Sequence, residues 1–195
     1  MLDKVRNHIR EKYNKPGEVY TGLIHRIDRP VGGVMVFART SKAAARLSEA
    51  FAGRTVEKIY WAITEKVPQP RSGRLTHFLT RLPGKNIMRA HIKEVPDSQK
   101  AILDYQVLAV KGENALVEVR PQTGRRHQIR VQLASLKAVI RGDVKYGETK
   151  FNPDKSICLY AKSLEFPHPV KEKGRMKFEA PYPDSAPWAD FKGKG

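Results

Sequence analysis

Two short apolar runs, Tyr20–Ile24 and Val34–Ala38, flank the stretch His25-Arg26-Ile27-Asp28-Arg29-Pro30. A proline and two glycines break the chain between the runs, so the pattern predicts a strand, a tight loop and a second strand. The loop carries one carboxylate, Asp28, between arginines. Nearby cations favour the ionised form of a carboxylate, so Asp28 could act as a nucleophile. Alternatively, Asp28 only accepts backbone hydrogen bonds within its own turn.

The chain is strongly basic, with 37 Lys+Arg against 20 Asp+Glu and a formal net charge of +17 over 195 residues. That charge indicates a polyanionic partner, either nucleic acid or an acidic membrane surface. No apolar run is long enough to span a bilayer, and we expect no signal peptide. The sole cysteine, Cys158, lies in an apolar run, which indicates a buried thiol in a reducing compartment. We therefore expect a cytoplasmic protein.

Helical spacing of apolar residues predicts a first helix over residues 2–14 and a second over residues 41–51. Thr40 or Ser41 can cap the second helix, and Gly53 can end it. Residues 55–66 alternate as a strand, with Trp61 on the face toward the core and Lys58 and Tyr60 on the other face.

The second half of the chain is rich in expected strands. Residues 66–74 read as a connection or hinge, and the strands after it are typical of an antiparallel meander. These strands span residues 75–82, 86–93, 101–110 and 115–120; a helix over 125–136 follows, then late strands over 156–166 and 175–180. The predicted class is α+β with a mostly antiparallel central sheet. Residues 1–183 form one domain, and residues 184–195 form a loose basic tail.

A second basic cluster comprises Arg120, Arg125, Arg126 and Arg130, which fall within a segment without carboxylates. On the expected helix, Arg126, His127 and Arg130 share a neighbourhood opposite an apolar stripe. The start of this helix could meet an anion such as a phosphate. The cluster can also be read as an ordinary solvated basic face. The histidines are scattered without ligand spacing, so we expect no metal site.

Three ordered motifs are more specific than any one of them alone. Together they resemble the RluA family of pseudouridine synthases across residues 11–182, and further matches lie at Arg141-Gly142-Asp143, Tyr146-Gly147 and Leu164–Pro169. The three motifs are His25-Arg26-Ile27-Asp28, Lys58-Ile59-Tyr60-Trp61-Ala62 and Thr123-Gly124-Arg125-Arg126-His127-Gln128-Ile129-Arg130.

The resemblance implies a central antiparallel sheet flanked by helices and loops, with an RNA-binding cleft. It implies that a cytoplasmic, monomeric enzyme converts uridine to pseudouridine in structured rRNA or tRNA, without metal or cofactor. By motif, Asp28 resembles the catalytic aspartate, Tyr60 the tyrosine that stacks on the target base, and Arg130 the arginine that pairs with the aspartate. The residues assigned to RNA or substrate binding are His25, Arg26, Arg29, Lys58, Arg125, Arg126, His127, Gln128 and Ile129.

The sequence departs from the family pattern in two places that bear on the fold. Family members usually carry Thr-Ser-Gly where this chain has Val31-Gly32-Gly33, so we expect a less firmly tied Asp28 loop. Members also normally begin with a strand ahead of the first helix, so we expect a catalytic domain that lacks its N-terminal strands. The alternative to an enzyme is therefore a truncated, non-catalytic, basic RNA-binding protein of the same fold. A third hypothesis, a metal-dependent nuclease, rests only on charge and scattered His and Asp residues.

Overall fold

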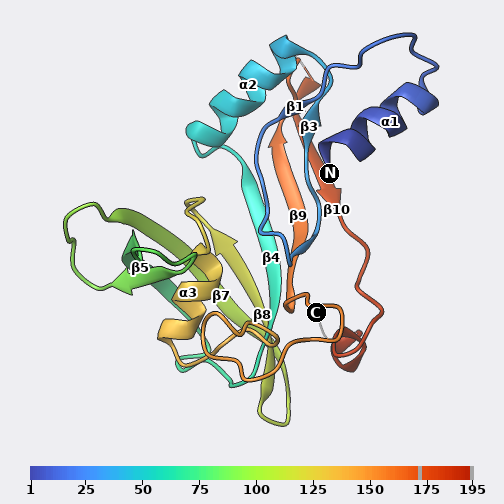
Figure 1. The fold of residues 1–195 in the computed structure, drawn as a ribbon. Coiled ribbons are helices and arrows are strands. Elements are labelled where there is room, and N and C mark those ends of the chain that lie inside the picture. The colour runs from blue at the N-terminus through green and yellow to red at the C-terminus, as the bar shows by residue number, and fades with distance from the viewer. Residues whose placement is uncertain (171–172, 194–195) are drawn as a thin grey trace.

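An eight-stranded sheet organises the protein, which we describe from a computed structural model over residues 1–170 and 173–193 (Figure 1). Within these residues seven strands follow the order β10-β9-β4-β8-β7-β5-β6, and all of these neighbours pair antiparallel. The eighth strand, β2, pairs with β9 in parallel. The strands are β1 (Gly22–Leu23), β2 (Gly32–Gly33), β3 (Phe37–Ala38), β4 (Glu57–Thr64), β5 (Ser72–Arg81), β6 (Met88–His91), β7 (Gln99–Lys111), β8 (Asn114–Pro121), β9 (Leu159–Pro167) and β10 (Arg175–Glu179). The helices are α1 (Leu2–Lys12), α2 (Ser41–Ala52), α3 (Gln128–Ser135) and the short 3₁₀ helix η2 (Trp188–Phe191). The predicted α+β class with a mostly antiparallel sheet is confirmed. None of the described helices is both long and apolar enough to cross a membrane.

The strand β4 lies between β8 and β9 near the middle of the sheet, as Figure 1 shows. Trp61 is buried on one face of β4, where its ring packs 5.4 Å from the ring of Tyr182. Lys58 and Tyr60 point to the opposite face, as the alternation predicts. This second face holds the cavity described below.

The strands β5 to β8 do not form a simple meander, and here the prediction is wrong. β7 pairs with β5 on the edge that β6 leaves free, so the order is β6-β5-β7-β8. β5 also begins at Ser72, within the expected connection. The remaining connection is bound to β7, because Tyr105 Oη donates to the carbonyl of Pro70 at 2.9 Å and the Val107 N–H donates to that of Arg71 at 2.8 Å. The sheet is therefore continuous where a hinge was expected.

The helix α2 and the small β1–β3 sheet cover one end of β9 and β10. The Thr40 hydroxyl caps α2 by accepting the Ala43 N–H at 3.1 Å, which confirms the predicted start. Leu47 of α2 is buried against Leu164 and Phe166 of β9. The same cluster includes Ile24 and Ala38, so this packing anchors the chain on both sides of the Asp28 loop.

The helix α3 is shorter and more deeply buried than the sequence indicated. It starts at Gln128, not at Arg125, because His127 adopts a left-handed conformation with φ of 50°. Every residue from Gln128 to Leu133 is buried, including Arg130. Arg130 therefore does not lie on a solvated face, and a charge inside the protein requires partners.

Part of the predicted loose tail packs against the core. Residues 188–191 form η2, in which Trp188 and Phe191 are buried in the main hydrophobic cluster. This part of the tail is ordered by apolar burial, and residues 194–195 lie outside the described residues.

A half-buried histidine, His25, connects the two sides of the Asp28 loop. Its Nε2 accepts the Val36 N–H at 3.1 Å, and its ring stacks on the Phe51 ring with centroids 4.8 Å apart. Burial, together with the charge of Lys58, lowers the pKa of His25 to about 4. The neutral ring can therefore keep accepting this hydrogen bond well below neutral pH.

Truncating the neighbouring residues Trp61 and Tyr60 should distinguish a side chain that stabilises the fold from one that lines the cavity. Trp61→Ala removes a buried aromatic ring and should lower the free energy of unfolding by about 3–5 kcal/mol. Tyr60 borders a cavity, so Tyr60→Ala should lower the free energy of unfolding much less. Urea unfolding of both variants tests this, and equal losses would contradict the assignment of the two faces of β4.

His25 should make stability depend on pH. In the unfolded chain His25 becomes protonated as pH falls below 6.5, its ordinary pKa. In the folded chain it becomes protonated only near pH 4. The free energy of unfolding should therefore fall as pH falls from 6.5 to 4, by up to about 3 kcal/mol. His25→Gln should flatten this part of the pH profile, whereas His8→Gln, at an exposed position of α1, should leave it unchanged. Profiles of His25→Gln and wild type that run parallel across this range would refute the role.

Candidate active site

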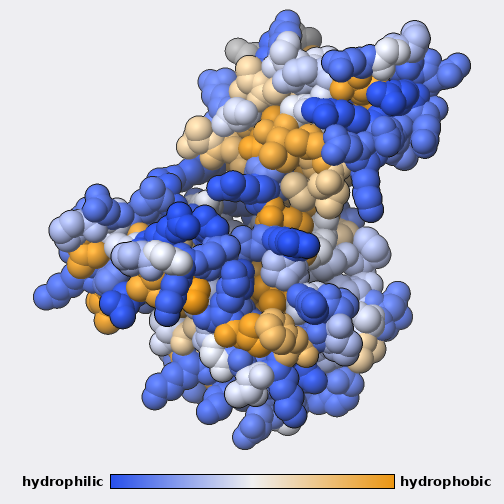
Figure 2. Space-filling model, in the orientation of Figure 1, coloured by the Kyte–Doolittle hydropathy of each residue, from blue (hydrophilic) through white to orange (hydrophobic). Residues whose placement is uncertain are grey.

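A cavity of about 500 Å³ opens on the face of β4 that carries Lys58 and Tyr60. Its walls come from the β1–β2 loop, the end of α2, β4, the turn before α3 and the first residues of α3. Figure 2 shows a hollow at the centre of this face, where hydrophilic residues surround hydrophobic ones. Asp28 is the only carboxylate among the described residues that line the cavity. Residues 24–31, 51–60 and 121–130, together with Leu159, thus surround a cavity that holds one acidic group.

The Asp28 loop is held by its backbone, contrary to the expectation that it is less firmly tied. The Val31 N–H donates to the Asp28 carbonyl at 2.9 Å, and β2 pairs with β9. Gly33 has a φ of +113°, and a Cβ there would lie 2.2 Å from the Ala161 carbonyl oxygen. Only glycine permits this approach. Backbone contacts thus hold this loop at Val31-Gly32-Gly33.

Arg130 links two carboxylates. Its Nη1 donates to Asp28 Oδ2 at 3.1 Å, while its Nε and Nη2 each donate to Asp143 at 2.7 Å. Asp143 and Arg130 are buried, with exposed fractions of 1% and 4%. The side chain of Asp28 is 28% exposed. Burial opposes the charge on Arg130, but the bonds to Asp143 and Asp28 outweigh it and raise the pKa of Arg130. The bidentate pair fixes the plane of the guanidinium, so that Nη1 points to the carboxylate that faces the cavity.

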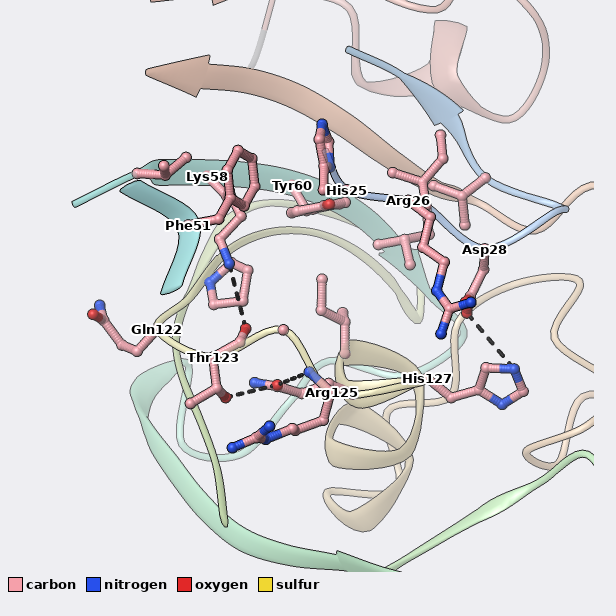
Figure 3. Close-up of a pocket in the computed structure, with 18 of the residues that line it drawn as sticks. His25, Arg26, Asp28, Phe51, Lys58, Tyr60, Gln122, Thr123, Arg125 and His127 are labelled. Carbon is pink, nitrogen blue, oxygen red and sulfur yellow. Dashed lines mark hydrogen bonds and ion pairs between the residues drawn. The ribbon is translucent and has the colours of Figure 1, made fainter. Parts of the chain in front are cut away.

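Tyr60 lines the same cavity as Asp28 (Figure 3). Burial, with the charge of Asp28 as a second cause, raises the pKa of Tyr60 to about 12. The phenol therefore stays neutral at physiological pH and adds no negative charge next to the carboxylate. Its ring offers a flat apolar surface to the cavity.

His127 and Tyr146 complete the surroundings of Arg130. The Tyr146 hydroxyl accepts the Met88 N–H at 2.9 Å and lies 2.9 Å from His127 Nδ1. The other ring nitrogen of His127, Nε2, lies 3.9 Å from Asp28 Oδ2. Burial is the largest cause that lowers the pKa of His127, and the charge of Asp28 opposes it. The guanidinium of Arg130 also lies 5.2 Å from the centre of the Tyr146 ring.

The turn before α3 is closed by its own side chains. Gln128 Oε1 accepts the Thr123 hydroxyl at 2.7 Å and the Arg125 N–H at 3.0 Å. The start of this helix was expected to meet an anion such as a phosphate, but the Arg125 N–H already donates to Gln128. Gln128 and the buried Ile129 line the cavity and support its floor.

The predicted binding residues divide between the cavity and the outer surface. Arg29 and Arg126 are exposed and do not line the cavity; Arg126 bonds to the side chain of Asn86. The predicted neighbourhood of Arg126 and Arg130 on one helix is therefore wrong, because α3 begins after Arg126. The predicted residues brought together in the cavity are Asp28, Tyr60, Arg130, His25, Arg26, Lys58, Arg125, His127, Gln128 and Ile129.

Sequence reasoning assigned no role to Asp143 and Tyr146, although both touch Arg130 or its neighbour. A signal was present, since a carboxylate directly after Gly142 follows an apolar segment and would be buried with it. The cation that would balance it could not be identified from the sequence, because Arg130 is thirteen positions away. Within the described residues, no three His, Cys, Asp or Glu side chains gather as metal ligands.

Comparison with known proteins gives a consistent result. The model of the family described as RNA pseudouridylate synthase matches residues 2–135. An uncharacterized RNA pseudouridine synthase of Zymomonas mobilis is 36% identical over 167 residues, which are 84% of this chain and 74% of that protein. The mouse mitochondrial pseudouridylate synthase RPUSD4 is 37% identical over 161 residues, which are 73% of this chain and 43% of that protein.

The fold is similar to that of solved structures. Human RNA pseudouridylate synthase domain containing 4 superposes with a TM-score of 0.76 at 28% identity, covering 93% of this chain and 78% of that one. The chain thus spans about three quarters of the Zymomonas relative and less than half of the mouse one. On the matched sequence and the shared fold, this chain belongs to the RNA pseudouridylate synthase family of isomerases.

Proposed function

We propose that this chain is an RNA pseudouridine synthase that isomerises uridine in structured rRNA or tRNA, with Asp28 as its nucleophile. The observation that carries the proposal is the carboxylate of Asp28, bonded to Arg130 at 3.1 Å in a cavity that Tyr60 also lines. A net charge of +17 suits a polyanionic substrate. We propose further that it acts as a cytoplasmic monomer without metal or cofactor; the single, buried Cys158 suits a reducing compartment.

The target uridine must leave its stack to reach Asp28, which costs a few kcal/mol. The Tyr60 ring offers the base a new stacking surface inside the cavity. The cations Arg26, Lys58 and Arg125 lie along the same cavity and would meet the RNA backbone as the base enters. Unstacking is thereby compensated by contacts made only when the nucleotide is in place.

Asp28 would then attack either C6 of the uracil or C1′ of the ribose. The bond between N1 and C1′ breaks, the detached base turns within the cavity, and C5 forms a new bond to C1′ as the bond to Asp28 is released. The C5 proton is lost to water, N1 takes up a proton in its place, and the aromatic base is restored, so that the product is an isomer of the substrate. Asp28 thus starts and ends as a carboxylate, and the reaction needs no redox partner.

Arg130 would position Asp28 rather than touch the base. Because Asp143 holds two of its N–H groups, the guanidinium cannot turn away when Asp28 becomes bonded to substrate. His127 borders the carboxylate on a second side, with its Nε2 3.9 Å from Asp28 Oδ2. The nucleophile is therefore aimed before the substrate arrives.

Removing the nucleophile should stop the reaction without releasing the RNA. Asp28→Ala should abolish tritium release from RNA labelled with 5-[³H]-uridine, while its affinity for RNA stays within about threefold because phosphate contacts dominate binding. Glu113→Ala, which removes an exposed carboxylate in the β7–β8 turn, should retain full activity. Turnover by Asp28→Ala would rule out the proposed role, and a wild-type chain that binds RNA without forming pseudouridine would favour the non-catalytic alternative.

Weakening the buried pair behind the nucleophile should lower turnover. Asp143→Asn loses the charge that holds Arg130, so kcat should fall by roughly 100-fold through misplacement of Asp28. The free energy of unfolding should fall by about 3 kcal/mol. Rates are to be measured at a temperature where unfolding curves show the variant folded. A folded Asp143→Asn with wild-type kcat would show that Asp143 does not position the site.

A further inference from the structure

The cavity extends well beyond the nucleophile. Lys58 and Tyr60 project from the same face of β4, two positions apart, which separates their origins by roughly 7 Å along the strand. Figure 3 shows Asp28 at one end of the cavity, Tyr60 near its middle and Lys58 toward the other end. A base stacked on Tyr60 beside Asp28 would therefore leave the Lys58 end for another part of the same RNA strand.

Lys58 carries a charge that the described residues do not balance. Its Nζ makes one long hydrogen bond, at 3.5 Å, to the carbonyl of Thr123, and none of the ion pairs found in the described residues involves it. Burial lowers the pKa of Lys58, and its charge in turn disfavours protonation of His25. A half-buried ammonium held only by a carbonyl is poorly compensated.

The surroundings of Lys58 are open to an anion. Gly124 has no side chain, and even a Cβ built there would lie 3.9 Å from Lys58 Nζ. Other cations also line the cavity, among them Arg54 from the segment between α2 and β4 and Arg125 from the turn before α3. The lone carboxylate of the lining, Asp28, already has Arg130 as its partner.

We propose that Lys58 binds a phosphodiester that flanks the target uridine, so that the cavity holds the flipped base at Asp28 and one of its phosphates at Lys58. This inference rests on the proposed function. An ammonium has three donors and no acceptor, so it suits a phosphate, whose oxygens only accept. It suits the uracil edge less well, because N3–H of the base needs an acceptor. The phosphate would supply the charge that Lys58 lacks and fix how far the nucleotide enters.

Uridine, uridine 5′-monophosphate and uridine 3′-monophosphate test this directly in calorimetric titrations of the full chain. One of the two monophosphates should bind wild type roughly tenfold more tightly than uridine, because a charge-assisted bond is added. Lys58→Met should abolish that difference and leave uridine binding unchanged, and Lys58→Arg should retain most of it. Lys66→Met, an exposed lysine beyond the end of β4, is the matched control and should behave as wild type.

Several results would overturn the proposal. They are equal binding of uridine and both monophosphates to wild type, failure of either monophosphate to bind at millimolar concentration, or an unchanged preference in Lys58→Met. Thermal unfolding tests whether Lys58 has only a structural role. Lys58→Met replaces a poorly compensated, half-buried charge, so it should not lower the unfolding temperature.

A second measurement separates this inference from the proposed catalysis. In the Asp28→Ala background, where no turnover is needed, Lys58→Met should reduce the salt dependence of rRNA or tRNA binding by about one ion contact. If the wild type forms no pseudouridine but the slope changes, the proposed function fails and the phosphate site stands. If the wild type is active but the slope and the nucleotide preference do not change, only the phosphate site fails.

Discussion

The buried contact between Arg130 and Asp143 is the constraint on which the site depends. Both side chains are almost fully enclosed, so neither charge is acceptable inside the protein without the other. Their bidentate geometry fixes the guanidinium, so that Nη1 points to Asp28. The position of the Asp28 carboxylate thus follows from a buried ion pair.

The sheet places the other parts of the site around this pair. β4 supplies Tyr60 and Lys58 because its other face is anchored by Trp61 in the core. The Asp28 loop is fixed because β2 joins the edge of β9 through Gly33, where a side chain would collide with backbone. His25 closes the same loop through a backbone N–H. The Asp28 loop, β4 and α3 are therefore positioned by contacts within the protein. This favours a cavity that exists before substrate binds.

Local patterns in the sequence predicted much of this arrangement. The alternation in β4 and the cap of α2 depend on nearby residues, so both could be read directly, and the motif resemblance brought Asp28, Tyr60 and Arg130 together. Features set by distant contacts could not be read in this way. They include the pairing of β7 with β5, the burial of Trp188 in the tail and the partnership of Asp143 with Arg130. The late start of α3 was missed because only the left-handed backbone of His127 reveals it.

The central claim is that Asp28, held by Arg130, performs the isomerisation. It is tested most directly by mapping pseudouridines in rRNA and tRNA from a strain that lacks the gene, complemented either with the wild-type chain or with Asp28→Asn. Asp28→Asn preserves the size of the side chain and removes its charge. The account predicts that the deletion loses a pseudouridine at a defined position, that the wild type restores it and that Asp28→Asn does not. Restoration by Asp28→Asn at the same level of protein would contradict it.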